Sequence, residues 1–187
     1  MRAPFQILAI PYKYENGMPI YCVLHRSDYD QWQFIAGGGE DVETPEDAAK
    51  REITEEGGIS VDNIISLKSM CHIPVEIFPR RHLYGWSDDL YVIPEYSFGF
   101  ECTDELVLSH EHTELVWLPY KEARERLQWD SNKTALYELN CILSKQPKND
   151  RLAPSLPCVK GGGTRQRFPE TSEMSFGGSL RSVTEGL

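Results

Sequence analysis

Apolar and polar positions along the first 145 residues alternate in short runs that predict a sheet covered by helices. Strand-like runs lie at 5–11, 20–26, 32–36, 64–75, 90–102 and 113–118. The sequence Asn16-Gly17 predicts a tight turn between the first two strands. Helical spacing is present at 44–56, 120–127 and 132–144, with Ser131 as an N-cap of the last helix. The order β-β-β-α-β-β-β-α-α predicts an α+β domain with a mixed sheet.

The last 42 residues differ from this body in composition. They contain six Gly, four Pro, five Ser and three Thr, with little apolar periodicity. The run Gly161 to Gly163 has no strand before it, no helix after it and no lysine at the spacing of a phosphate-binding loop. We therefore expect one domain over residues 1–145 and a disordered tail over 146–187.

Charge and cysteine content limit the classes of partner. The formal net charge is −10, which argues against a nucleic acid polymer or an anionic membrane as the main partner. The five cysteines are scattered without a C-x-x-C pair, which is typical of a protein from a reducing compartment. No signal sequence or membrane span is predicted, so we expect a cytoplasmic protein.

The acidic residues concentrate before and within the predicted helix 44–56. Residues 40–56 hold eight acids against two bases, a pattern that a solvated helix face would also produce. The ends of this helix are well marked. Thr44 is a suitable N-cap, Pro45 suits the first turn, Asp47 completes a capping box, and Gly57-Gly58 ends the helix.

Three carboxylates on this helix form one stripe. Glu52, Glu55 and Glu56 stand at i, i+3 and i+4, where like charges destabilise a helix. A hard divalent cation such as Mg²⁺ or Mn²⁺ would relieve the repulsion, because it prefers oxygen ligands. The triplet alone leaves the cation site and the solvated face equally open.

A longer spacing resembles a known family motif. Gly37-x5-Glu43-x7-Arg51-Glu52-Ile53-x-Glu55-Glu56-x-Gly58-Ile59 is similar to the Nudix box at all nine specified positions. The resemblance implies a Nudix-type α/β/α sandwich with a mixed β-sheet, a loop-helix-loop metal site and hydrolysis of a phosphoanhydride. It departs from many members at Ala36, where they carry proline.

The resemblance also implies roles for individual residues. Glu52, Glu55 and Glu56 would bind the metal, with the carbonyl of Gly37 or Gly38 completing the shell. The structural positions of the motif would be Glu43, Arg51 and Gly58, the first two as an ion pair.

The mechanism that follows is attack of a metal-activated water on phosphorus, which needs a carboxylate to accept a proton. The candidates are Glu52 and an acid of the segment 108–118, where Glu111 is favoured over Glu114 as base or additional ligand. His110 and His112 offer a less favoured zinc pair, since no third soft ligand is near in the sequence.

Basic and aromatic side chains are the candidates for substrate binding, because arginine binds phosphate oxygens and aromatic rings stack on heterocycles. These candidates are Arg26, Trp32, Arg80, Arg81, Tyr84 and Trp86. The middle loop and the segments 109–117 and 129–133 are similar to the dihydroneopterin triphosphate and dATP pyrophosphohydrolase branch. We expect a nucleoside or pterin triphosphate, or another nucleoside diphosphate-linked compound, as substrate. A diadenosine polyphosphate hydrolase and a non-catalytic nucleotide-sensing module are the alternatives. The oligomeric state stays open, with a homodimer as one option.

Overall fold

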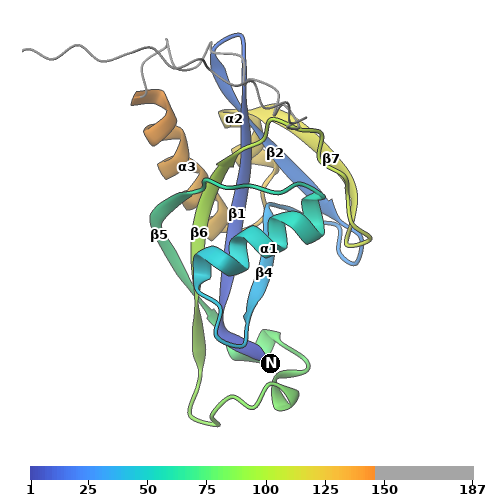
Figure 1. The fold of residues 1–187 in the computed structure, drawn as a ribbon, viewed down its shortest axis with the longest axis vertical. Coiled ribbons are helices and arrows are strands. Elements are labelled where there is room, and N and C mark those ends of the chain that lie inside the picture. The colour runs from blue at the N-terminus through green and yellow to red at the C-terminus, as the bar shows by residue number, and fades with distance from the viewer. Residues whose placement is uncertain (146–187) are drawn as a thin grey trace, which may run out of the picture. The chain divides into compact units, whose positions relative to one another are not determined.

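The computed structural model describes residues 1–145 of the 187-residue chain, and the expected tail at 146–187 lies outside them. These residues form strands, three α-helices and two short 3-10 turns (Figure 1). The strands are β1 Arg2–Glu15, β2 Met18–Arg26, β3 Trp32–Gln33, β4 Ile35–Glu40, β5 Ile65–Pro74, β6 Val92–Glu101 and β7 His112–Pro119. The helices are α1 Pro45–Gly57, α2 Tyr120–Arg126 and α3 Asp130–Lys145, and the 3-10 turns are η1 Val75–Ile77 and η2 Arg81–Leu83.

The seven strands form one mixed sheet in which β1 is the long central strand. Along one edge β1 pairs antiparallel with β4 near its start and with β2 near its end. Along the other edge it pairs parallel with β6, which in turn pairs antiparallel with β5. β7 extends the sheet beyond β2, whereas β3 pairs with the end of β2 on the same edge that β1 uses. Parallel and antiparallel pairs therefore meet at β1 and again at β6.

Helices cover both faces of this sheet. On one face the apolar side of α1, including Ala49 and Ile53, packs against Ile7 and Phe98. On the other face α3 packs Leu136 and Leu139 into a second cluster, and α2 contributes Ala123. In Figure 1 α1 crosses in front of β1 and β4 while α3 lies alongside β5 and β6. The predicted α+β fold with a mixed sheet is confirmed.

The structure corrects the predicted element order in one place. The expected third strand at 32–36 is two strands, and the second of them continues through the glycine run to Glu40. Glycine is uncommon in strands, so the pattern alone predicted a loop. Ser131, expected as an N-cap, lies inside α3, which begins at Asp130.

The other predicted elements agree with the structure to within a few residues at their ends, except that β1 extends further in both directions. The turn between β1 and β2 has Asn16 at φ 51° and Gly17 at φ 73°, the left-handed geometry that Asn-Gly favours. No helix within residues 1–145 has the length and apolar character needed to cross a membrane.

Candidate active site

Helix α1 is fixed at both ends by its own sequence. The Thr44 hydroxyl accepts from the Asp47 amide at 3.2 Å, and the Asp47 carboxylate accepts from the Thr44 amide at 3.3 Å. At the other end Gly58 adopts φ 69° and donates its N–H to the Thr54 carbonyl. A side chain at Gly58 would be strained and would also meet Val107 at 2.9 Å. These caps set the rotation and the end of the helix that carries the three glutamates.

The glycines of β4 leave room for side chains from both faces of the sheet. A Cβ atom at Gly37 would lie 1.9 Å from the carboxyl carbon of Glu52. A Cβ atom at Gly38, on the opposite face, would lie 2.1 Å from the guanidinium carbon of Arg2. The Glu52 carboxylate therefore packs directly on the β4 backbone, where no other residue type would admit it.

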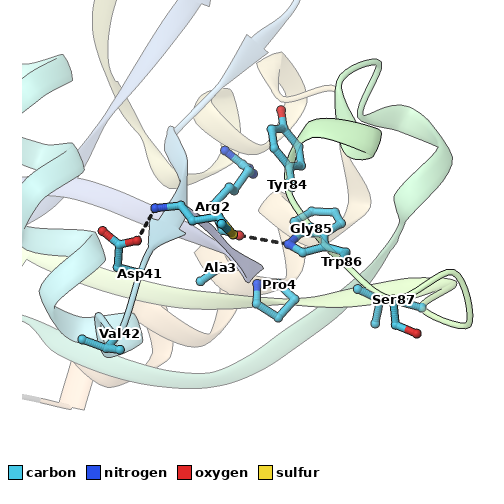
Figure 2. Close-up of a pocket in the computed structure, with 11 residues that line it drawn as sticks. Arg2, Ala3, Pro4, Asp41, Val42, Tyr84, Gly85, Trp86 and Ser87 are labelled. Carbon is cyan, nitrogen blue, oxygen red and sulfur yellow. Dashed lines mark hydrogen bonds and ion pairs between the residues drawn. The ribbon is translucent and has the colours of Figure 1, made fainter.

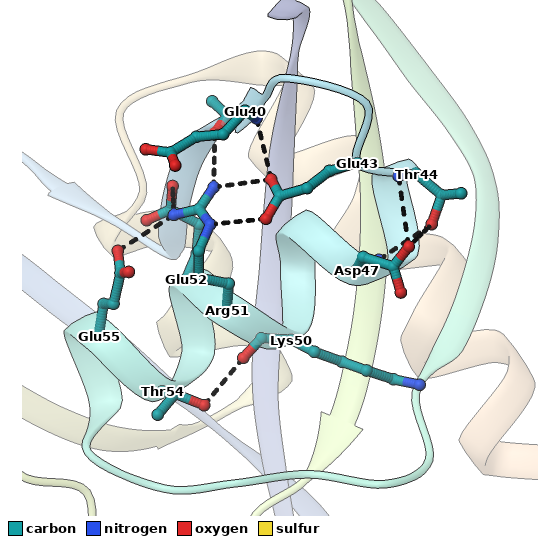
Figure 3. A network of polar contacts seen from close by, with 10 residues as sticks. Glu40, Glu43, Thr44, Asp47, Lys50, Arg51, Glu52, Thr54 and Glu55 are labelled. Atoms are coloured by element: carbon teal, nitrogen blue, oxygen red, sulfur yellow. Dashed lines mark hydrogen bonds and ion pairs between the residues drawn. The ribbon is translucent and has the colours of Figure 1, made fainter. Parts of the chain in front are cut away.

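Arg51 joins the loop to the helix (Figure 3). Its Nε and Nη2 donate to the Glu43 carboxylate at 3.0 and 3.2 Å, and Nη2 also donates to the Gly38 carbonyl at 2.8 Å. Its Nη1 donates to Glu52 Oε1 at 2.9 Å and to Glu55 Oε2 at 3.0 Å. The guanidinium holds the pKa of Glu43 below its usual range. The ion pair suggested by the motif is present, and Arg51 also contacts two of the three candidate metal ligands.

Glu52 and Glu56 are buried carboxylates, whereas Glu55 is exposed. Burial raises the pKa of Glu52, although Arg51 partly opposes the rise. Burial, followed by the charges of Glu52 and Glu111, raises the pKa of Glu56 to about 9. Glu56 Oε2 has no hydrogen-bond partner. An unpaired buried carboxylate is costly unless a cation compensates it.

His112 lies beside this unpaired oxygen at the start of β7. Its Nε2 is 3.8 Å from Glu56 Oε2, which is beyond hydrogen-bond distance, and neither ring nitrogen has a partner. Burial lowers the pKa of His112, which favours the neutral ring. A second orphaned polar group therefore lies against the same carboxylate.

The two candidate bases differ in their placement. Glu111 lies in the exposed turn before β7, and its charge acts on both Glu52 and Glu56. Glu114 lies further along β7 opposite His25, and no contact joins it to the cluster in the described residues. His110, exposed in the same turn as Glu111, likewise has no contact with the carboxylates in residues 1–145.

The residues present fit a divalent cation. The buried Glu56 oxygen without a partner and the Glu52 carboxylate seated on the Gly37 backbone offer hard oxygen ligands one turn apart on α1. As the side chains stand in residues 1–145, no three His, Cys, Asp or Glu groups already converge on a common metal position. Part of the reason is that Arg51 holds oxygens of Glu52 and Glu55.

The predicted substrate residues are distributed over two regions. Trp32 and Arg26 lie at the β2–β3 end, where Trp32 packs under Arg126 at 4.8 Å and Arg26 pairs with Asp28. The charge of Arg26 also acts on Glu56. The remaining four candidates belong to the β5–β6 loop: Arg80, Arg81, Tyr84 and Trp86.

A pocket of about 650 Å³ lies between this loop and the start of β1 (Figure 2). Tyr84 and Trp86 line it, together with Arg2 and with Asp41 from the loop after β4. The Trp86 indole donates to the Arg2 carbonyl at 3.0 Å. Arg80 is exposed, and neither it nor Arg81 lines this pocket. Two of the four loop candidates thus lie beside the segment 37–43, which we name the metal loop after the metal ligand that the motif predicts there.

Three polar residues on the face of the sheet opposite α1 were not predicted as site residues: Arg2, Gln6 and Glu95. Arg2 lies over the rings of Phe78 and Tyr84 and donates to Gln6 at 2.6 Å. Glu95 on β6 is buried, and its Oε1 has no partner. All three lie within strands, where a polar residue is ordinarily expected to face solvent.

Comparison with known proteins agrees with this geometry. The family model described as NUDIX domain matches residues 11–139. Dihydroneopterin triphosphate diphosphatase of Haemophilus influenzae is 29% identical over 139 residues, covering 66% of this chain and 87% of that protein.

Two solved structures show the same fold. A NUDIX hydrolase of Listeria monocytogenes superposes with a TM-score of 0.67 at 44% identity, over 80% of this chain and 97% of that one. Dihydroneopterin triphosphate pyrophosphohydrolase of E. coli gives a TM-score of 0.59 at 26% identity, over 74% and 97%. The family match, these structures and the carboxylate helix lead to one conclusion: the chain belongs to the NUDIX family and is a pyrophosphohydrolase of that family.

Proposed function

We propose that the protein is a divalent-cation-dependent pyrophosphohydrolase whose substrate is a nucleoside or pterin triphosphate. The observation that carries the proposal is the pair of buried carboxylates, Glu52 and Glu56, against the glycine strand β4. The similarity to two dihydroneopterin triphosphate hydrolases favours a triphosphate on a flat ring as the substrate class.

Three glutamates of α1 would hold the cation. Glu52, Glu55 and Glu56 supply carboxylate oxygens, and the β4 backbone at Gly37 or Gly38 supplies a carbonyl. When bound, Mg²⁺ or Mn²⁺ neutralises the phosphates and acidifies a water for in-line attack on phosphorus. The raised pKa values of Glu52 and Glu56 describe the protein without its cation and are expected to fall when the cation binds.

Other residues of the chain position these ligands and take up the proton. Arg51 on α1 donates both to the Gly38 carbonyl and to the Glu43 carboxylate, which keeps the loop at a fixed distance from the helix. The water's proton passes to a carboxylate, for which Glu111 is suited because it is exposed and its charge is felt by Glu52 and Glu56. Glu52 is the second candidate acceptor.

The phosphates and the ring need separate contacts. Arg26 lies on the Glu56 side of the site and supplies positive charge there, whereas Tyr84 and Trp86 line the pocket beside the metal loop. We assign the phosphates of the substrate to the side of the site that carries the α1 glutamates, and its ring to the face of the sheet that carries Tyr84. Trp32 packs against Arg126, and none of Trp32, Arg80 and Arg81 lines this pocket, so these three residues are secondary candidates.

The test is product identification by mass on a panel of phosphate compounds, with Mg²⁺, with Mn²⁺ and with a chelator. The panel contains nucleoside triphosphates, dihydroneopterin triphosphate, diadenosine tetraphosphate and ADP-ribose. We expect pyrophosphate release from a triphosphate, and no turnover in chelator. Turnover of diadenosine tetraphosphate alone would move the protein to the other hydrolase class, and binding without turnover would identify a sensing module.

Two substitutions on α1 distinguish the loss of a cation ligand from the loss of a negative charge on the helix. Glu55→Gln removes a ligand and should lower kcat by about 100-fold or more, because the cation that this carboxylate holds stabilises the charged transition state. Glu46→Gln makes the same chemical change two turns earlier, where the side chain only pairs with Lys50. It should leave kcat within about twofold. Equal effects of the two variants would contradict the assignment.

A further inference from the structure

A row of three positions crosses the sheet on the face opposite α1. Gly38 of β4 pairs with Gln6 of β1, and Gln6 pairs with Glu95 of β6. Residues directly opposite in neighbouring strands point to the same face. Neighbouring strands are about 4.8 Å apart, so the Glu95 Cα lies about 10 Å from the metal loop at Gly38. The side chains of this row lie on the face that α3 covers, because Gly99, four residues beyond Glu95, packs against Leu139 of α3.

Glu95 is a buried carboxyl that no basic side chain contacts within residues 1–145. Its side chain is 6% exposed, Oε1 has no hydrogen-bond partner, and Ser131 at the start of α3 is the one group that hydrogen-bonds to it within the described residues. Burial raises its pKa to about 7. The half-buried Gln6, Cys71 and Ser131 surround it, so the carboxyl lies one side chain beneath the surface.

A structural carboxylate on the same face of the sheet, that of Glu138, differs from Glu95 because it is fully hydrogen-bonded. Glu138 of α3 accepts from the amides of Lys68 and Ser69 at 2.8 and 2.7 Å, and also from the Ser69 hydroxyl. These bonds lower the pKa of Glu138. Glu95 has no comparable set of donors, although such a set would stabilise the fold. A buried acceptor that the protein itself leaves unpaired is available to a ligand.

Aromatic rings and positive charge lie at the other end of the row. Arg2 covers Gly38, donates to Gln6 and lies over the rings of Phe78 and Tyr84 at 5.2 and 5.6 Å. The face thus carries flat rings and a guanidinium near the metal loop and an unpaired carboxyl further in. That order matches a substrate with phosphates at one end and a hydrogen-bonding heterocycle at the other.

The hydrogen-bonding chemistry of the carboxyl limits which heterocycles it can bind. A carboxylate accepts two parallel N–H bonds, as it does from a guanidinium. A ring N–H next to an exocyclic amine presents two such donors, and this 2-amino-4-oxopyrimidine edge is shared by guanine and pterin. Adenine and cytosine present an amine next to a ring nitrogen that accepts, which a carboxylate repels.

We propose that Glu95 is the specificity-determining residue of this enzyme and that it binds the 2-amino-4-oxopyrimidine edge of a guanine or pterin substrate, with Ser131 as its positioning residue. The inference rests on the proposed pyrophosphohydrolase function and names the ring that this function acts on.

The test compares kcat/KM of the full chain for four triphosphates in Mg²⁺: GTP, dihydroneopterin triphosphate, ATP and CTP. The wild type should favour GTP or dihydroneopterin triphosphate, and the favoured one identifies the source of the ring. Glu95→Gln should lower kcat/KM for the favoured substrate roughly 10- to 100-fold and change ATP by less than about twofold. Glu138→Gln, the matched control on the same face, should leave the order of substrates unchanged.

Binding of the ring alone supplies a measurement that does not depend on turnover. Neopterin and guanosine carry the edge without phosphates, and the wild type should bind at least one of them more tightly than adenosine, with this difference lost in Glu95→Gln. Equal loss for all four triphosphates, or a wild type that prefers ATP, would overturn the role of Glu95 while leaving the hydrolase intact. Absence of turnover on every triphosphate, with ring binding still dependent on Glu95, would instead reject the hydrolase proposal alone.

Discussion

Replacing Glu95 by glutamine should change how stability depends on pH, in a direction opposite to most carboxyl substitutions. A glutamate has an ordinary pKa of 4.5, and burial raises the pKa of Glu95 to about 7 in the folded protein. The folded state therefore holds a proton that the unfolded state releases between these two values. The wild type loses stability as the pH rises from about 4.5 to about 7, and the loss is complete above that range.

The magnitude follows from the width of this window. One pKa unit corresponds to about 1.4 kcal/mol, so 2.5 units correspond to about 3 kcal/mol at pH 8. Glutamine does not titrate. The free energy of unfolding of Glu95→Gln, relative to wild type, should accordingly rise by about 3 kcal/mol between pH 4 and pH 8.

Urea unfolding, followed by tryptophan fluorescence at several pH values in chelator, measures this difference without any contribution from a bound cation. Glu138→Gln is the control of opposite sign. The pKa of Glu138 is lowered, so its stabilisation is present above pH 4.5 and lost as the pH falls below it. If the difference in free energy of unfolding between Glu95→Gln and the wild type stayed constant across the pH range, the conclusion that Glu95 is a buried, unpaired carboxyl would be refuted.

Three further substitutions test the geometry of the site and the sheet. Gly37→Ala places a Cβ 1.9 Å from the Glu52 carboxyl carbon and so displaces that carboxylate. Calorimetric titration should show a Mg²⁺ affinity at least tenfold weaker than in the wild type. An unchanged affinity would show that Glu52 does not bind the cation. Arg51→Lys cannot reproduce the paired bonds to Glu43 and should lower the free energy of unfolding in urea by about 1–3 kcal/mol. A decrease of less than about 0.5 kcal/mol would show that the network has no structural role. Gly99→Ala overlaps a leucine of α3 at 2.6 Å and should lower the free energy of unfolding by about 1–3 kcal/mol with kcat unchanged, whereas a selective loss of kcat would connect α3 to the chemistry.

The parts of the site that could be predicted from the sequence are those determined by residues close together along the chain. The N-cap at Thr44, the stop at Gly58 and the carboxylates between them depend on residues within one helix, and the structure has each of them where the spacing indicated. Strand positions were predicted from period-two alternation, which fails where glycine replaces apolar residues, as in β4.

The parts that could not be predicted depend on long-range pairing. Glu95 is in a strand whose alternation gives no sign that Ser131, from a later helix, closes over it. Arg2 precedes an apolar run and would ordinarily extend into solvent, but Phe78 and Tyr84 from the β5–β6 loop lie against it. Each burial is decided by a residue far along the chain, and no local pattern records it.

The parallel pairing of β1 with β6 has a consequence for synthesis on the ribosome. Gln6 pairs with Glu95 and Tyr12 pairs with Glu101, so the central strand, which is made before β6, cannot be paired on that edge until β6 has left the exit tunnel. The hairpin partner β2 arrives early and covers only the end of β1. Between the synthesis of β1 and that of β6 the nascent chain thus exposes one apolar strand edge, and chaperones or slow codons would affect the folding yield during this interval.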